Sequence, residues 1–178
     1  MFQATFVRHV LTDRSDRDRN RITALQPSDR GMIHELVRQS FSEVYGSLVR
    51  KSFEEHFETR AAGLDDGRHY FKYVHLGKTV GVAGYHVHRW DPPNTCTAGW
   101  FFVHPQSRSL FVVRALAKRV LLATVNAGID RIVVETSSSL PAAALLKKLH
   151  IPVAGIIEAF YPDGGDKLIF DLRLPRNH

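Results

Sequence analysis

The sequence predicts one mixed α/β domain in which helices cover both faces of a central sheet. Segments with apolar residues at helical spacing alternate with short runs of β-branched and aromatic residues, which is the pattern of such a fold. The length of 178 residues suits a single domain. Hydrophobic residues make up 44% of the chain and charged residues 24%, a balance typical of globular proteins.

Hydrophobic spacing, capping residues and turn residues divide the chain into four helices and seven strands. The helices are expected over about 29–41, 47–62, 108–127 and 141–149. The strands are expected over about 22–25, 70–76, 79–90, 97–103, 132–135, 153–160 and 167–174. The resulting order is β, α, α, three strands of antiparallel type, α, β, α, β, β, with no internal repeat.

The first 21 residues are expected to form an extension that precedes, or belongs to, a domain over 22–178. Weak alternation of Phe2, Ala4 and Phe6 favours one further strand. The stretch 14–21 mixes arginines with aspartates, so we interpret it as a solvated linker rather than a nucleic-acid-binding arm.

The amino-acid composition limits where in the cell the protein is expected and which partners it is expected to bind. No run of about 18 apolar residues is present, so we expect no transmembrane helix, and the N-terminus lacks the features of a secretion signal. Cys96 is the only cysteine, which excludes an internal disulfide and fits a reducing cytoplasmic compartment. The net charge of +6 favours an anionic partner such as a phosphorylated cofactor or an acidic carrier protein.

The strongest motif lies at 103–108, where the sequence Val-His-Pro-Gln-Ser-Arg continues without a gap into a helix. A buried-strand pattern follows at 132–136, then a helix at 142–149 and a closing hairpin pattern at 158–169. This run resembles the GNAT superfamily of N-acetyltransferases, in which a strand ending in Val-x-Pro leads into a phosphate-binding loop and a helix. The resemblance implies the GNAT fold and transfer of an acetyl or acyl group from acyl-CoA to an amine, without a metal.

The resemblance also implies where the acyl donor binds. In the family the pantetheine arm pairs like an extra strand beside a splayed strand, and the pyrophosphate docks on N–H groups at the N-terminus of the next helix. The residues that match this site are Phe102, Val103, Arg108, Ser109, Leu110, Phe111, Val112, Val113, Arg114 and Ser139.

The sequence departs from the family at its most informative positions. The family loop is R-x-x-G-x-G, because glycine lets the backbone approach the phosphates closely. Arg108 matches its first residue, but Phe111 and Val113 replace the two glycines and are expected to hinder a tight pyrophosphate cradle. Leu146 stands where the family commonly has a tyrosine that protonates the leaving thiolate, and His150 stands at a glycine position.

Proton transfer therefore needs other residues, and three are candidates. His86 and His88 share one face of the strand expected over 79–90, and either can act as a base near neutral pH. Tyr161, in the closing hairpin, can line the acceptor pocket or serve as an acid. The alternative for all three is plain packing or exposure without catalysis.

Aromatic residues surround the expected donor site. Phe101, Phe102 and Phe111 are expected to pack in the core, with an apolar tunnel for a long acyl chain as the alternative.

Three functions remain open. The chain is an N-acyltransferase that uses acyl-CoA, an acyltransferase that takes its acyl group from acyl carrier protein, or a catalytically inactive GNAT-fold binding protein. A carrier-borne arm has one phosphate and no pyrophosphate, so missing glycines matter less for it. The amine acceptor, the acyl-chain length and a homodimer are left undecided, and neither nucleic acid nor a membrane is expected as a partner.

Overall fold

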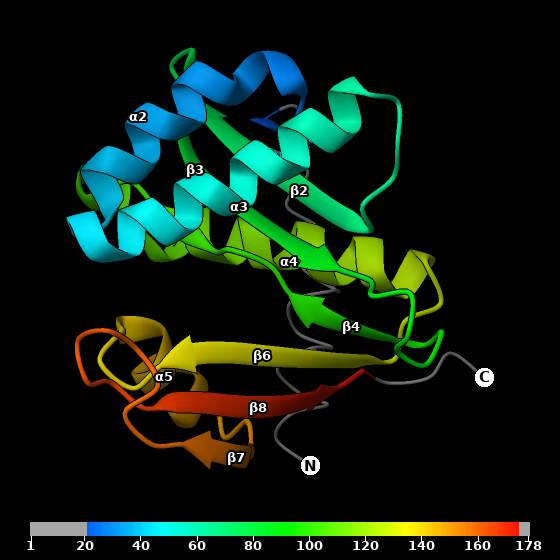
Figure 1. Cartoon of the computed structure of the whole chain (residues 1–178), viewed down its shortest axis with the longest axis vertical. Helices are drawn as coiled ribbons and strands as arrows, with labels where there is room; N and C mark the ends of the chain where they lie inside the picture. The colour runs from blue at the N-terminus through cyan, green and yellow to red at the C-terminus, as the bar shows by residue number, and fades with distance from the viewer. Residues whose placement is uncertain (1–20, 175–178) are drawn as a thin grey trace. The chain divides into compact units, whose positions relative to one another are not determined.

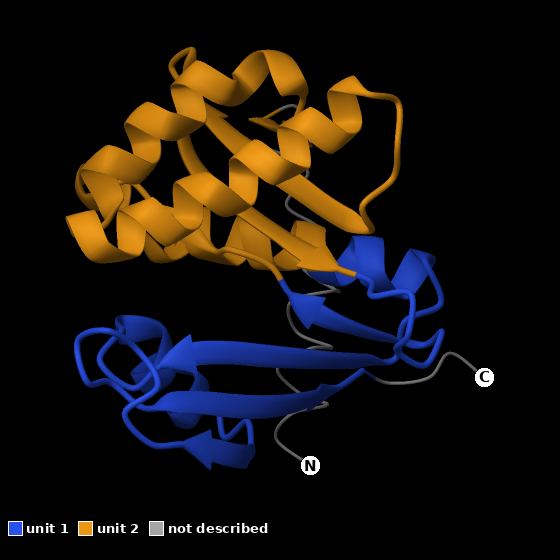
Figure 2. Ribbon diagram, viewed as in Figure 1, with its two compact units in different colours: residues 1–13, 87–98, 121–178 blue, residues 14–86, 99–120 orange. Residues whose placement is uncertain are grey.

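The structure is a computed structural model that describes residues 21–174. Its backbone forms two compact units (Figure 2), of which unit 2 comprises residues 14–86 and 99–120 and unit 1 the remainder. The strand expected near Phe2 and the linker expected at 14–21, apart from Arg21, lie outside the described residues.

Unit 2 contains a small antiparallel sheet covered by helices (Figure 1). Its strands are β1 (Ile22–Ala24), β2 (Arg68–His75), β3 (Lys78–His86) and the short β5 (Phe102–Val103). Its helices are α2 (Arg30–Ser40), α3 (Glu43–Ala61) and the first part of α4 (Leu110–Asn126), with short 3-10 turns η2 (Pro27–Asp29) and η3 (Pro105–Ser107). β2 pairs with both β1 and β3, and β5 pairs with β3.

The core of unit 2 follows the helical periodicity of its sequence. Ile33 and Val37 of α2 and Val49 and Phe53 of α3 are fully buried and pack in one cluster with Val82 of β3. These residues recur every three or four positions, so each helix presents one apolar stripe to the sheet.

The opposite face of β3 is covered by α4. A Cβ atom on Gly81 would lie 2.9 Å from Leu116 Cδ1 and 3.2 Å from Val103 Cγ2. Because successive strand residues point to opposite faces, Gly81 meets α4 while its neighbour Val82 meets the cluster with α2 and α3. Helices therefore cover both faces of the sheet in this unit, as the sequence predicts.

Unit 1 contains a second group of strands in the order β4, β6, β8, β7. These are β4 (Thr95–Ala98), β6 (Arg131–Ser137), β8 (Lys167–Arg173) and β7 (Val153–Ile157), and the helix α5 (Pro141–Lys148) follows β6. β4 and β6 pair in parallel, and the other two pairs are antiparallel. Cys96 of β4 is fully buried, and this burial raises the pKa of its thiol to about 12, so the thiol is unreactive at neutral pH.

Two predicted strands differ most from the structure, and a third, expected over 153–160, ends at Ile157. The strand expected over 97–103 is broken, because Gly99 donates its N–H to Gly84 O (2.8 Å) and only Phe102 and Val103 resume pairing, now with β3. The strand expected to reach residue 90 ends at His86, because a turn follows in which Asp91 donates its N–H to His88 O (3.1 Å).

Tyr70 crosses directly over two glycines in unit 2. A Cβ atom would lie 2.3 Å from Tyr70 Cδ1 if placed on Gly84, and 2.9 Å from Tyr70 Cε1 if placed on Gly99. Tyr70 is buried, and burial raises the pKa of its hydroxyl to about 12. The break after β4 is thus tied to the fit of one ring against two backbones.

We predict that Gly84→Ala lowers the free energy of unfolding by about 2 kcal/mol or more, because the added methyl overlaps the Tyr70 ring. Gly31→Ala is the matched control: nothing lies within 4 Å of its Cβ position in α2, so stability should rise by up to about 1 kcal/mol. Urea denaturation of both variants measures the two effects. A Gly84→Ala protein as stable as the wild type contradicts the packing described for Tyr70.

Candidate functional site

A strand, a turn and a helix meet in unit 2 where the sequence predicts the donor site. Val103 ends β5 opposite Gly81, and His104 donates its N–H to Val80 O at 2.8 Å. Pro105 has no N–H to continue a ladder, and it opens the 3-10 turn η3 instead. The helix α4 begins five residues later at Leu110.

Most backbone donors of this turn are used within it. The N–H of Gln106 donates to His104 Nδ1 (3.2 Å), and the N–H of Ser107 donates to His104 O (2.8 Å). Ser109 in turn donates its N–H to Ser107 O (2.8 Å). The turn is thus closed by its own hydrogen bonds, and these three donors are not available to a ligand.

The N-terminus of α4 offers two open donors. Ser109 caps the helix, since its Oγ accepts from the N–H of Val112 (3.3 Å) and its O accepts from that of Val113 (3.2 Å). Among residues 21–174, the N–H groups of Leu110 and Phe111 donate no hydrogen bond, and neither does the N–H of Arg108 just before the cap. Together with the helix dipole, such N–H groups favour an anion.

The side chains around these donors point in different directions. Leu110 is 70% exposed and Phe111 48% exposed, whereas Val112 is buried in the unit. Arg108 folds back, and its Nε donates to Val103 O at 3.2 Å, while Arg114 is half-buried. The helix end is therefore open to solvent on the side where Leu110 and Phe111 lie.

The aromatic residues of this segment do not share one environment. Phe102 is buried, and its ring packs edge-on against Phe41 (5.1 Å between centroids) and Phe53 (6.0 Å). Core packing is thus confirmed for Phe102, but Phe101 and Phe111 are exposed, so core packing is wrong for them. A donor can reach Phe102 through its backbone only.

His86 is the last residue of β3 and is held by the loop that precedes β2. Its Nε2 donates to Asp66 O at 3.0 Å. The Asp66 carboxylate is itself partly buried and accepts from Nδ1 of the buried His56 (2.8 Å) and from the N–H of Arg68 (3.0 Å). Although burial opposes ionisation, the hydrogen bonds from His56 and Arg68 outweigh it and lower the pKa of Asp66.

His88 was expected beside His86 on one strand face, and this expectation is wrong. β3 ends before His88, so the alternation of strand side chains does not extend to it. His88 instead lies in the following turn, and its ring stacks on that of Trp90 with 5.5 Å between centroids.

Tyr161 and Ser139 lie in unit 1, where both belong to the hydrogen-bonded connections around β8. Tyr161 donates its N–H to Gly165 O (3.0 Å). Ser139 Oγ donates to Asp163 Oδ2 (2.9 Å) and lies 2.8 Å from Ser137 Oγ. The Ser139 hydroxyl thus links the end of β6 to the loop between β7 and β8.

The end of α5 supports the matching of this chain to the GNAT pattern. His150, at the position of a family glycine, has a φ of 55°, in the left-handed region that favours glycine after a helix. This conformation agrees with the sequence matching that puts Leu146, four residues earlier, at the family's tyrosine position.

A protein-family model described as the acetyltransferase (GNAT) family matches residues 31–151. The match covers more than half of the chain and includes β5, the turn and α4. The chain belongs to the GNAT acetyltransferase family. The family and the transferase class that the sequence predicts are thereby confirmed.

Solved structures of GNAT proteins share the fold. A GNAT-family protein from Desulfovibrio desulfuricans has a TM-score of 0.73 at 21% identity, with 86% of this chain and 98% of that chain covered. The ribosomal-protein-S18-alanine N-acetyltransferase from Escherichia coli has a TM-score of 0.66 at 21% identity, with 88% and 95% covered. The PaiA N-acetyltransferase from Thermoplasma acidophilum, in complex with coenzyme A, has a TM-score of 0.62 at 11% identity, with 85% and 97% covered.

These likenesses confirm the predicted GNAT fold. None of the curated protein sequences compared with this GNAT chain matches it. No helix among residues 21–174 is both long and apolar enough to cross a membrane. The same residues contain no group of three or more His, Cys, Asp or Glu side chains placed to hold a metal ion.

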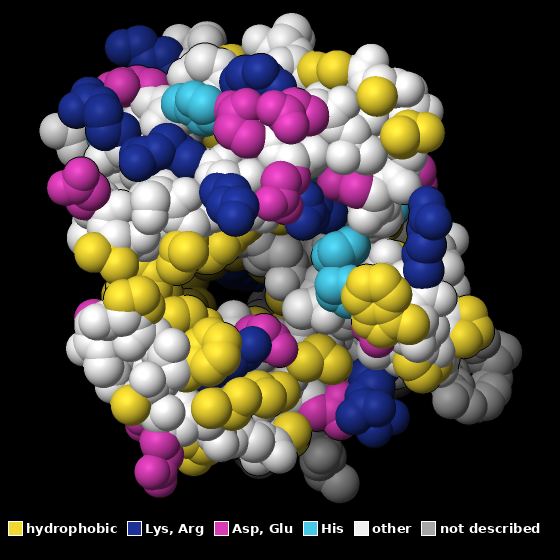
Figure 3. All heavy atoms as spheres, viewed as in Figure 1, with side chains coloured by type: hydrophobic (Ala, Val, Ile, Leu, Met, Phe, Trp, Pro, Cys, Tyr) yellow, Lys and Arg dark blue, Asp and Glu magenta, His cyan; other side chains and the backbone are white. Residues whose placement is uncertain are grey.

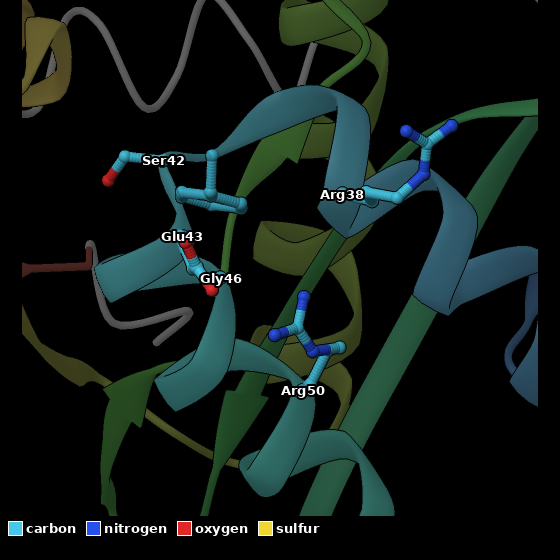
Figure 4. A pocket seen from close by; sticks show the side chains of 6 residues that line it. Arg38, Ser42, Glu43, Gly46 and Arg50 are labelled. Carbon is cyan, nitrogen blue, oxygen red and sulfur yellow. The ribbon is translucent and has the colours of Figure 1, made fainter.

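The GNAT chain also has a pocket that sequence reasoning missed. It lies in unit 2 where α2 passes into α3 and has a volume of about 280 Å³ (Figure 4). Its lining residues are Arg38, Phe41, Ser42, Glu43, Gly46 and Arg50. The signal available in the sequence was a pair of arginines flanking the junction of two helices, but helical spacing alone places both on ordinary solvated faces.

Charges on the outer face of α2 and α3 are largely paired. On the face drawn in Figure 3, basic and acidic side chains are interspersed over these helices. Arg30 lies 3.4 Å from Glu54, and Arg38 lies 2.6 Å from Glu35. The net positive charge of the chain therefore forms no continuous basic patch on this face.

We predict that Asp66→Asn destabilises the protein in a pH-dependent way. The folded state lowers the pKa of Asp66, so its contribution is fully present above the unfolded pKa of about 3.9 and is lost as the pH falls further. The difference in unfolding free energy between wild type and variant should be largest near pH 7 and shrink below about pH 4. Denaturant titrations across this range measure it.

Asp65→Asn provides the control. Asp65 is exposed, forms an ion pair with Arg60 (3.1 Å) and accepts from the N–H of Gly67 (3.0 Å). An asparagine can still accept that N–H, so the substitution should cost less than about 1 kcal/mol. Equal effects of the two variants at all pH values would show that the Asp66 carboxylate is not the ionised partner of His56.

Proposed function

We propose that the protein transfers an acetyl or acyl group from acyl-CoA to an amine of a small molecule or a protein. The observation that carries this proposal is the pair of open N–H groups on Leu110 and Phe111, placed directly after the strand end at Val103. In a GNAT chain this is the position of donor phosphate binding, and coenzyme A is present in the solved PaiA structure, which supports the same donor here.

The donor is held by backbone groups in this proposal. One phosphate accepts from the N–H groups of Leu110 and Phe111, where the helix dipole favours negative charge. The amides of the pantetheine arm run along Phe102 and Val103, in the manner of an added strand. Arg108 adds positive charge beside the phosphate, although its Nε is engaged with Val103 O.

The reaction makes one bond and breaks one. The amine nitrogen attacks the thioester carbonyl carbon, a C–N bond forms, the C–S bond breaks, and the amine loses a proton while the thiolate gains one. We propose His86 as the base, because an imidazole is suited to take a proton from an ammonium and donation of Nε2–H to Asp66 O holds this ring at the end of β3. Tyr161 or water then returns a proton to the thiolate, since Leu146 has no ionisable group.

The same two N–H groups favour a second candidate donor, the phosphopantetheine arm of acyl carrier protein. This arm carries one phosphate and no pyrophosphate, so it needs fewer of the open donors at the start of α4. The chain's net charge of +6 suits an acidic carrier.

We predict that free CoA binds with a Kd above about 100 μM, equivalent to less than about 5.5 kcal/mol. The turn uses most of its own donors, and Phe111 and Val113 carry side chains where the family has none. The double variant Phe111→Gly with Val113→Gly should tighten binding, as measured by calorimetry. Ala117→Gly, farther along α4, controls for loss of helix stability.

Low-micromolar binding of CoA to the wild type would show that the bulky side chains leave the phosphates room. Binding of acyl carrier protein with no gain from the double glycine variant would favour the carrier-borne donor.

We predict that His86→Ala lowers turnover by about 10²- to 10⁴-fold while donor affinity stays nearly unchanged, because only proton removal is lost. His88→Ala and Tyr161→Phe test the other two candidates. His75→Ala, at the exposed end of β2, is the control. Thiol release from acyl-CoA with an amine panel measures turnover.

Full activity in all three site variants would mean that water carries the proton. Absence of turnover with every donor and amine would favour the inactive GNAT-fold binding protein.

A further inference from the structure

We infer that the acceptor is an amine that also bears a carboxylate, and that Arg50 and Glu43 hold it in the pocket between α2 and α3. This inference rests on the acyl transfer proposed above and names the acceptor class for it. It depends on the charges, the size and the neighbours of the pocket, all within unit 2.

Of the two arginines that line the pocket, Arg50 is the one that no carboxylate of the described residues pairs with. Figure 4 shows its guanidinium directed toward Gly46, whereas that of Arg38 points away from the other lining residues. Arg38 is already bound to both oxygens of Glu35, at 2.6 and 2.9 Å. Among the described residues, no acidic side chain lies within 4 Å of the half-buried Arg50 guanidinium, which has the geometry to bind a carboxylate through two hydrogen bonds.

Glu43 supplies the opposite charge in the same pocket. It lies in the first turn of α3, where the helix dipole favours negative charge, and no cation pairs with it in the described part of the chain. A simple anion would be repelled by Glu43, and a diamine would be repelled by Arg50. An occupant with both an ammonium and a carboxylate satisfies both side chains.

The volume of the pocket favours a small acceptor. About 280 Å³ lies at or just below the lower end of the range for ligand pockets. An amino acid or a closely related amine therefore fits, and the ring of Phe41 supplies an apolar wall for its carbon chain.

The pocket also adjoins the strand on which the donor arm is proposed to lie. Phe41 lines the pocket, and its ring packs against Phe102 (5.1 Å between centroids) and Trp100 (6.3 Å). Phe102 belongs to β5 and directly precedes Val103 at the strand end. An amine seated against Phe41 is thus close to the segment that would carry the thioester.

The test compares amines that differ only in the carboxylate, namely lysine with cadaverine and phenylalanine with phenethylamine. We expect kcat/KM with acetyl-CoA to be about 10- to 100-fold higher for the amino acids, mainly through KM, because one charge-assisted hydrogen-bonded pair is lost without the carboxylate. Arg50→Gln should abolish this preference, because the amino acids lose the partner of their carboxylate and cadaverine is no longer repelled by the guanidinium. Glu43→Gln should weaken all four substrates.

Arg38→Gln is the matched control, since Arg38 lines the same pocket but is paired with Glu35, and it should keep the preference. Arg50→Lys should restore part of what Arg50→Gln loses. Circular dichroism of each variant checks that the fold is retained.

Direct binding separates this inference from the proposed function. Lysine and phenylalanine should raise the melting temperature of the wild type but not of Arg50→Gln, whether or not acyl transfer occurs. Stabilisation without any thiol release would overturn the proposed function and keep the pocket assignment. Turnover with equal kcat/KM for both members of each pair would overturn the pocket assignment and keep acyl transfer.

Discussion

Neighbouring segments contact the backbone of β3 closely on both of its faces. Three glycines make this contact possible, two of them in β3 and one after β4. Gly81 leaves room for Leu116 of α4, while Gly84 and Gly99 lie under the ring of Tyr70. Side chains at these positions would separate α4 and the segment after β4 from the sheet. Because Phe102 and Val103 pair with β3 only where this approach is close, the start of the following turn depends on it.

The places in unit 2 where a ligand can bind depend on which polar groups are not already paired within the fold. Asp29 is buried and lies 2.5 Å from Lys72, and the Asp66 carboxylate is occupied by His56. These pairs join η2 to β2 and α3 to the loop before β2, so they support the fold and contribute no open charge. The start of α4 and the α2–α3 junction are two places in the described part of unit 2 where polar groups remain open.

The departures from the family loop have a consistent structural meaning. The chain from Pro105 to Ser109 closes on itself as a short turn, Ser109 caps α4, and Phe111 and Val113 at the family's glycine positions lie inside that helix. The helix end supplies the remaining donors, because the first N–H groups of any α-helix lack partners within the helix. His150 illustrates the same tolerance, since its backbone keeps the left-handed conformation of the glycine that it replaces.

The sequence by itself determined the helices, most of the strands and the strand–turn–helix motif at Val103, because these depend on periodicity, caps and Pro105, all of which are local signals. It located Arg108 to Val113 as the candidate donor site, but it could not indicate which N–H groups the turn would use internally. Only the tertiary structure decided that β3 ends at His86, which removed His88 from the strand face.

The pocket also depended on tertiary structure, since it is formed where Phe41 packs against Phe102 and where no carboxylate of residues 21–174 pairs with Arg50. Periodicity reports which face of an element is buried but not which distant segment covers it, and both the break at Gly99 and the pocket arise from such distant contacts.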